Sequence, residues 1–177
     1  MVVGDRLYFY FGAWSAETKK TRTCKFAPAC STVYAGGSTG VAMLRRDGFA
    51  SMDAGKTPGV LTTTAISFKG RYPFVNVEAK AGELRMEVLD TDGRVIAPFS
   101  LANCVPVKAD STRQRITWKH GADLSKLAGK PVRFRFQLTN GKLYSFWVSA
   151  DSSGASHGSV AAGGPGFTGP IDTVGGR

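Results

Sequence analysis

Residues 132–139 alternate between apolar and polar side chains, and this pattern limits the possible fold more than any other part of the sequence. Successive side chains of a strand point to opposite faces, so Val132, Phe134, Phe136 and Leu138 would share one buried side. A turn at Asn140-Gly141 follows. Residues 143–148 are apolar on both faces, which predicts a central strand within a two-layer core.

Further short strands are separated by turn signals rather than by helical patterns. A turn at residues 90–94 contains Asp92-Gly93, a pair that suits tight turns, and Val95 would begin the return strand. Residues 123–127 are the single candidate helical turn. We therefore expect an all-β protein, an antiparallel, jelly-roll-like β-sandwich. The other expected strands are residues 6–14, 39–44, 59–63, 65–68, 74–77, 84–89 and 115–119.

Length and composition fit one soluble globular domain. The chain has 177 residues, of which 42% are hydrophobic, and a formal net charge of +10. No apolar run reaches the roughly 18 residues of a membrane helix, so we expect no membrane partner. We divide the chain into an N-terminal strand with a basic loop (1–38), the sandwich (39–150) and an irregular Gly-rich tail (151–177) that drapes over the sandwich or is mobile.

The three cysteines do not form a complete disulfide framework. Cys24 and Cys30 lie six positions apart and could pair, leaving Cys104 spare, while three free thiols are an equally weighted alternative. The chain has no Cys-x-x-Cys, and both histidines are far from this pair. We therefore expect no metal site, and we assign no cofactor.

No catalytic residue can be assigned from spacing. Residues 36–40 and 154–158 match the Gly-x-Ser-x-Gly pattern of hydrolase nucleophile elbows, but no helical pattern follows either match. His120 and His157 each lack a second histidine nearby, so a structural or solvated role is the simpler interpretation.

Aromatic side chains offer flat faces for sugar rings, although aromatics in strands more often belong to the core. Trp118 and Tyr72 are the best binding candidates because neighbouring Lys and Arg residues suggest a wet face. Trp14 is a third candidate.

Two segments resemble the end of a five-bladed β-propeller glycosidase, of the kind found in glycoside hydrolase families thirty-two and forty-three. They are Gly4-Asp5-Arg6-Leu7-Tyr8-Phe9-Tyr10-Phe11-Gly12-Ala13-Trp14-Ser15 and residues 39–52. Residues 82–90, 99–104, Trp118 and 127–136 are similar to the β-sandwich attached after such propellers. The resemblance implies that residues 4–15 are a closing propeller strand, and that the catalytic acids belong to an upstream propeller domain.

The leading hypothesis is thus a non-catalytic accessory module of a carbohydrate-active protein, which could bind polysaccharide. Arg45 and Arg46, with Asp47, would lie at the junction between domains or in a solvated turn, and are further ligand candidates. The positive charge would favour an anionic glycan. A stand-alone glycan-active hydrolase is the alternative. Nucleic-acid binding ranks last because the basic residues are scattered.

Cellular location is left open by the sequence. The first six residues carry no export signal, whereas derivation from a secreted glycoside hydrolase would imply an extracellular or periplasmic location. The aromatic first strand would expose a hydrophobic edge in the absence of a propeller. We expect it to cause self-association, and thus a homo-oligomer, or to be covered by a fold-back.

Overall fold

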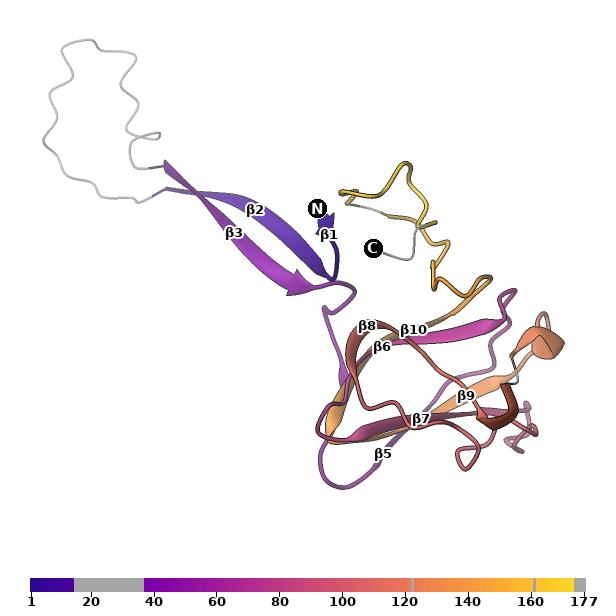
Figure 1. Cartoon of the computed structure of the whole chain (residues 1–177). Coiled ribbons are helices and arrows are strands. Elements are labelled where there is room, and N and C mark those ends of the chain that lie inside the picture. Colours follow the sequence, from indigo (N-terminus) through magenta and orange to yellow (C-terminus); the bar gives the residue numbers. More distant parts are fainter. Residues whose placement is uncertain (15–36, 122, 161, 174–177) are drawn as a thin grey trace, which may run out of the picture.

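A computed structural model describes residues 1–14, 37–121, 123–160 and 162–173 (Figure 1). The protein is all-β, as expected, and its strand pairs are antiparallel. The strands are β1 (Val2–Val3), β2 (Arg6–Trp14), β3 (Gly37–Arg45), β4 (Met52–Ala54), β5 (Gly59–Thr62), β6 (Tyr72–Glu78), β7 (Glu83–Leu89), β8 (Asp110–Arg115), β9 (Arg133–Thr139) and β10 (Gly141–Ser149). Two short 3-10 turns, η2 (Lys119–Gly121) and η3 (Ser125–Leu127), lie between β8 and β9.

Two of the sheets form the sandwich, in agreement with the predicted two-layer core. One has the strand order β4-β10-β6-β8 and the other β5-β9-β7. Val75 and Val77 of the first sheet and Leu84 and Met86 of the second belong to one buried cluster. Burial of apolar surface between the layers is the main force that holds them together.

The alternation in residues 132–139 has the predicted effect in β9. Phe134, Phe136 and Leu138 are buried between the sheets, whereas the Arg135 guanidinium lies on the other face, 2.9 Å from a carboxylate oxygen of Glu87 on β7. The Phe134 ring contacts Phe68, Phe136 and Phe146. The centre of the core is therefore aromatic.

The apolar run at residues 143–148 is also explained, because β10 lies between β4 and β6. Phe146 and Val148 pack against the core, while the Trp147 ring stacks on Phe74 at 5.7 Å and its indole N–H donates to the Gly154 carbonyl. Gly154 belongs to the tail. The outer face of this sheet is thus covered partly by the tail, in which Ala155 is fully buried.

Several strand boundaries differ from the expectation. Residues 65–68 and the return segment at Val95 make single bridges, Ile66 to Val132 and Val95 to Leu89, instead of strands. β8 spans Asp110–Arg115 rather than residues 115–119. Residues 115–119 likewise contain an isolated bridge, Trp118 to Cys104. The side chains of these segments suit strands, but tertiary context decides such cases.

The expected domain boundary at residue 39 is wrong, because it falls inside β3. This strand pairs with β2 from Arg45↔Arg6 to Gly37↔Trp14 and has no neighbour in the sandwich. β1, β2 and β3 form a separate three-stranded sheet, whose long hairpin of β2 and β3 reaches away from the sandwich (Figure 1). The division therefore follows Arg45.

None of the helices in the described part of the chain is long and apolar enough to cross a membrane.

Replacement of Phe134 tests whether its ring cluster holds the two layers together. Phe134→Ala should lower the free energy of unfolding by about 3 to 5 kcal/mol, because it leaves a cavity at a fully buried site. Chemical denaturation measures the loss. Val60→Ala is the matched control, since Val60 is 61% exposed and its truncation should cost less than about 0.5 kcal/mol. Equal losses in both variants would contradict this account of the core.

Candidate functional site

The hairpin of β2 and β3 is the most unusual surface in the described chain. Its residues 7–14 and 37–44 include no charged side chain, in a protein with a net charge of +10. Large hydrophobic side chains nevertheless stand in solvent: Phe9, Tyr10, Phe11, Val41 and Met43 are exposed by 44 to 63%. Contiguous exposed apolar surface of this kind marks interaction sites in soluble proteins.

Both faces of the hairpin carry this apolar surface. In the register of the pair, Tyr10 lies opposite Val41 on one face, and Phe9 lies opposite Ala42 on the other. Phe11 lies over Gly40, where a Cβ atom would come within 2.5 Å of the Phe11 ring. Strands that read as continuous hydrophobic runs are typical of sheets covered on both sides.

The edges of the hairpin are open as well. The outer edge of β3 has no neighbouring strand in the described chain, and β1 pairs only with Arg6 and Leu7 of β2. An isolated two-stranded ribbon is only marginally stable in water. Exposed edges without charged residues invite pairing with another strand. The hairpin thus resembles the inner strands of a larger sheet, but its faces and edges are exposed to solvent.

A buried asparagine fixes the base of the hairpin to the sandwich. Asn76 of β6 is fully buried and makes hydrogen bonds with Arg45 and Arg46, the two arginines at the end of the hairpin. The Arg45 Nε–H donates to Asn76 Oδ1 at 2.6 Å, and the Asn76 Nδ2–H donates to the Arg46 carbonyl at 2.7 Å. Arg45 also forms an ion pair with Asp110 at 2.6 Å and lies over the Tyr144 ring.

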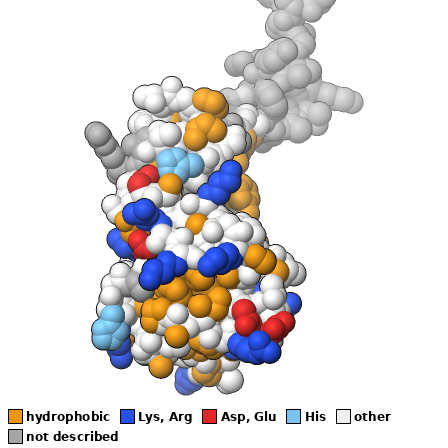
Figure 2. Space-filling view, turned by 90° about the vertical axis from the view of Figure 1, so that its right-hand side faces the viewer, with side chains coloured by type: hydrophobic (Ala, Val, Ile, Leu, Met, Phe, Trp, Pro, Cys, Tyr) orange, Lys and Arg blue, Asp and Glu red, His pale blue; other side chains and the backbone are white. Residues whose placement is uncertain are grey.

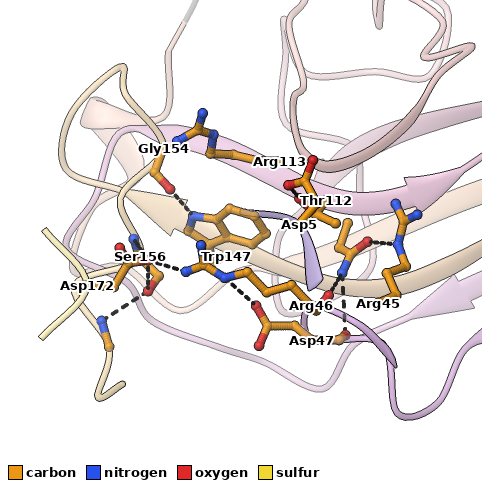
Figure 3. Close-up of polar contacts among 12 residues, drawn as sticks. Asp5, Arg45, Arg46, Asp47, Thr112, Arg113, Trp147, Gly154, Ser156 and Asp172 are labelled. Carbon is orange, nitrogen blue, oxygen red and sulfur yellow. Dashed lines mark hydrogen bonds and ion pairs between the residues drawn. The ribbon is translucent and has the colours of Figure 1, made fainter. Parts of the chain in front are cut away.

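The tail and the turn between β1 and β2 complete this junction. The Arg46 guanidinium lies 3.0 Å from a carboxylate oxygen of Asp172, which is buried in the tail and also accepts a hydrogen bond from the Ser156 hydroxyl (Figure 3). The Thr112 hydroxyl donates to Asp5. Of the three residues expected at a junction between domains or in a solvated turn, Arg45 and Arg46 form contacts between the hairpin, the sandwich and the tail.

A pocket opens beside the junction. It has a volume of 410 Å³ and lies between the hairpin base, at Asp5, Arg6 and Arg45, and the start of β8, at Asp110 and Thr112. Its lining is mostly polar and of mixed charge. This lining would suit water or a hydrogen-bonding partner surface more than an apolar ligand.

The prediction that Trp118 has a wet face is wrong. Trp118 is 2% exposed, its indole N–H donates to the Met86 carbonyl, and Phe99 packs against it edge to face. The side chain is part of the core and cannot stack on a sugar. Neighbouring Lys and Arg residues misled the prediction because alternate positions of one segment face opposite sides.

Tyr72 does lie at the surface and is half-buried. Its ring is flanked by the guanidinium carbons of Arg115 and Arg71, at 4.3 and 5.7 Å from the ring centre. Contact with the Tyr72 side chain raises the pKa of Arg71 above its usual value. Tyr72 is therefore the centre of a cationic cluster rather than a bare platform. For Trp14, only the backbone position at the end of β2 is described.

The serine, histidine and cysteine residues considered in the sequence analysis do not form a catalytic or metal-binding group in the described part of the chain. The Ser156 hydroxyl donates to Asp172, whereas His157 Nε2 lies 3.0 Å from Asp151, so the two side chains engage different carboxylates. Burial raises the pKa of the Cys104 thiol, which packs in the core. Cys24 and Cys30 lie outside the described residues. Among the described residues, no group of three or more His, Cys, Asp or Glu side chains could hold a metal ion.

Basic side chains are prominent on the face of the molecule that Figure 2 shows. Figure 2 shows Lys and Arg side chains in a row across one face of the molecule, beside a group of hydrophobic side chains, with few acidic residues among them. The excess of basic over acidic side chains on this face agrees with the net charge of +10.

Comparison with known proteins does not place the chain. No family model, curated protein or solved structure matches it.

Replacement of Asn76 tests the junction. Asn76→Ala would leave the Arg46 carbonyl and the Arg45 Nε–H without their partner, at a cost of about 1 to 3 kcal/mol. Amide hydrogen exchange should therefore speed up at the hairpin base, above all at Arg46, whose N–H donates to the Asp5 carbonyl. Asn140→Gly, a change in an exposed turn, is the control. Unchanged exchange at Arg46 in Asn76→Ala would show that Asn76 does not anchor the hairpin.

Proposed function

We propose that this chain is a non-catalytic accessory β-sandwich module of a carbohydrate-active protein, joined to a neighbouring β-sheet domain through the hairpin of β2 and β3. The observation that supports the docking role is the uncharged aromatic hairpin, exposed on both faces and along its edges. The buried Asn76 junction supports it further, because a fixed hairpin needs less ordering when it binds.

The form of the hairpin favours a sheet-containing domain over a second copy of this chain as its partner. Face-to-face association of two hairpins would cover one face of each, and edge-to-edge pairing would cover one edge. Phe9 and Tyr10 lie on opposite faces, so one such contact leaves half of the apolar surface in water. A domain into which the hairpin inserts as internal strands would cover both faces and supply backbone partners at the edges.

The carbohydrate part of the proposal comes from the sequence resemblance. In five-bladed propellers of the glycoside hydrolase type, blades pack face to face, so a closing hairpin would be covered on both sides. The proposed partner is therefore a propeller-type domain that would carry the catalytic acids. The sandwich would stabilise this domain and contribute to polysaccharide binding.

Phe11 and Tyr10 lie on opposite faces of the hairpin, and their joint replacement tests the docking surface. Without a partner domain, exposed apolar hairpins should associate with each other, so the purified chain should gain mass with concentration in light scattering. The double variant Tyr10→Ser/Phe11→Ser should be monomeric and should keep the thermal stability of the sandwich. Val60→Ser/Val95→Ser, which alters exposed residues of the sandwich, is the matched control.

Two results would contradict the docking role. One is a monomeric wild-type chain that also fails to bind a hydrophobic dye, and the other is equal association of the hairpin variant and the control.

Turnover tests the alternative function, a stand-alone hydrolase. We expect no release of reducing sugar when the purified chain is incubated with neutral and anionic polysaccharides. Release above the blank, in fractions that follow the protein through purification, would favour the hydrolase and overturn the accessory role.

A further inference from the structure

Arg71 and Arg115 lie beside Tyr72 and form a cluster that belongs neither to the Asn76 junction nor to the hydrophobic core. Tyr72 begins β6 and Arg115 ends β8, the strand next to it in the same sheet. The Arg115 guanidinium carbon lies 4.3 Å from the centre of the Tyr72 ring, and that of Arg71 lies 5.7 Å from it. Two positive groups therefore flank one phenol.

Neither of these arginines forms a close ion pair with an acidic residue of the described chain. Five other arginines lie within 4.0 Å of a carboxylate, namely Arg45, Arg46, Arg85, Arg94 and Arg135. In the described part of the chain, no ion pair within that distance involves Arg71 or Arg115. Hydrogen bonds from Ser125, whose N–H donates at 2.9 Å, are the main reason that the pKa of the Asp123 carboxyl is lowered, and the charges of Arg71 and Arg115 lower it to a smaller extent.

The hydrogen bonding of Arg115 is also incomplete. Its Nε atom is buried and has no acceptor, a state shared among the described residues only with Arg133 Nε. Proteins rarely leave a buried donor without a partner, so this N–H calls for an acceptor such as a water, an ion or a ligand. The half-buried guanidinium is held over Tyr72 and is thus ordered before any ligand arrives.

We propose that Arg71, Tyr72 and Arg115 form a binding site for an anionic sugar residue, one that bears a carboxylate or a sulfate group. A planar guanidinium can donate two parallel hydrogen bonds to either group, and a second guanidinium adds charge at the same place. The phenol adds a hydroxyl and an apolar edge for the sugar ring. The assignment to a sugar rests on the proposed carbohydrate-related function, whereas the preference for an anion rests on the cluster itself.

The test is affinity electrophoresis of the whole chain in native gels that contain dextran, dextran sulfate or polygalacturonate. At about 0.15 M salt, where long-range attraction is largely screened, one of the two anionic polymers should retard the chain and neutral dextran should not. The polymer that retards it identifies sulfate or carboxylate as the recognised group. A DNA duplex added as competitor, at the same concentration of negative charge as the anionic polysaccharide, should not displace the polysaccharide from the chain.

Two variants locate the binding. Arg71→Gln changes an exposed residue and should weaken binding about tenfold without altering the fold, since it removes one charged hydrogen-bonding group. Arg115→Lys keeps the charge but loses the planar fork, and should weaken binding by a similar factor. Arg94→Gln, on the exposed turn after β7, removes the same charge elsewhere and should bind like the wild type.

Four results would overturn the site: no retardation of the wild type by either anionic polymer, unchanged binding in both cluster variants, an equal loss in Arg94→Gln, or equal competition by DNA. Loss of the site would leave hairpin docking intact. Failure of docking, in turn, is measured by light scattering and would not alter retardation in the gels.

Discussion

The arrangement of this protein depends on one buried amide, the side chain of Asn76. It accepts from the guanidinium of Arg45 and donates to the carbonyl of Arg46, so one side chain fixes both residues at which the hairpin enters the sandwich. A fully buried amide is costly unless its groups are paired, and this pairing exists only when the hairpin base is in place. The contact fixes the backbone at Arg46, whose guanidinium in turn reaches Asp172 of the tail.

The fixed base distinguishes the hairpin from a loose end and supports its proposed docking role. The sixteen residues 7–14 and 37–44 of its strands include no charged side chain. Aromatic side chains are exposed on both faces of the hairpin. Water is a poor environment for such a ribbon. The sandwich, in contrast, has its own aromatic core around Phe134, to which no residue of β2 or β3 belongs. The molecule thus combines a sandwich that has its own core with a hairpin whose apolar side chains stand in water.

The sequence predicted the sandwich well because alternation and turn residues report directly on strands, as in β9 and β10. It predicted the hairpin strands but not their pairing, since 39–44 reads equally well as a sandwich strand and only long-range contacts decide the partner. The site was harder. Trp118 proved to be core because exposure depends on tertiary packing, and Asn76 was missed although a polar residue within the apolar run of β6 was a visible signal. The Tyr72 cluster joins two segments more than forty residues apart, Arg71 and Arg115, so no local pattern could reveal it.

The most direct test of the central claim is the distance between the hairpin and the sandwich in solution. Spin labels at Ser38 on β3 and Lys126 on η3, both exposed, can be placed in a background that lacks Cys24 and Cys30, with Cys104 buried in the core. Pulsed electron resonance on dilute protein should give one narrow distribution at the long separation set by a hairpin that stands away from the sandwich. A dominant short distance would show that the hairpin folds back, and would contradict the account of an anchored, projecting docking element.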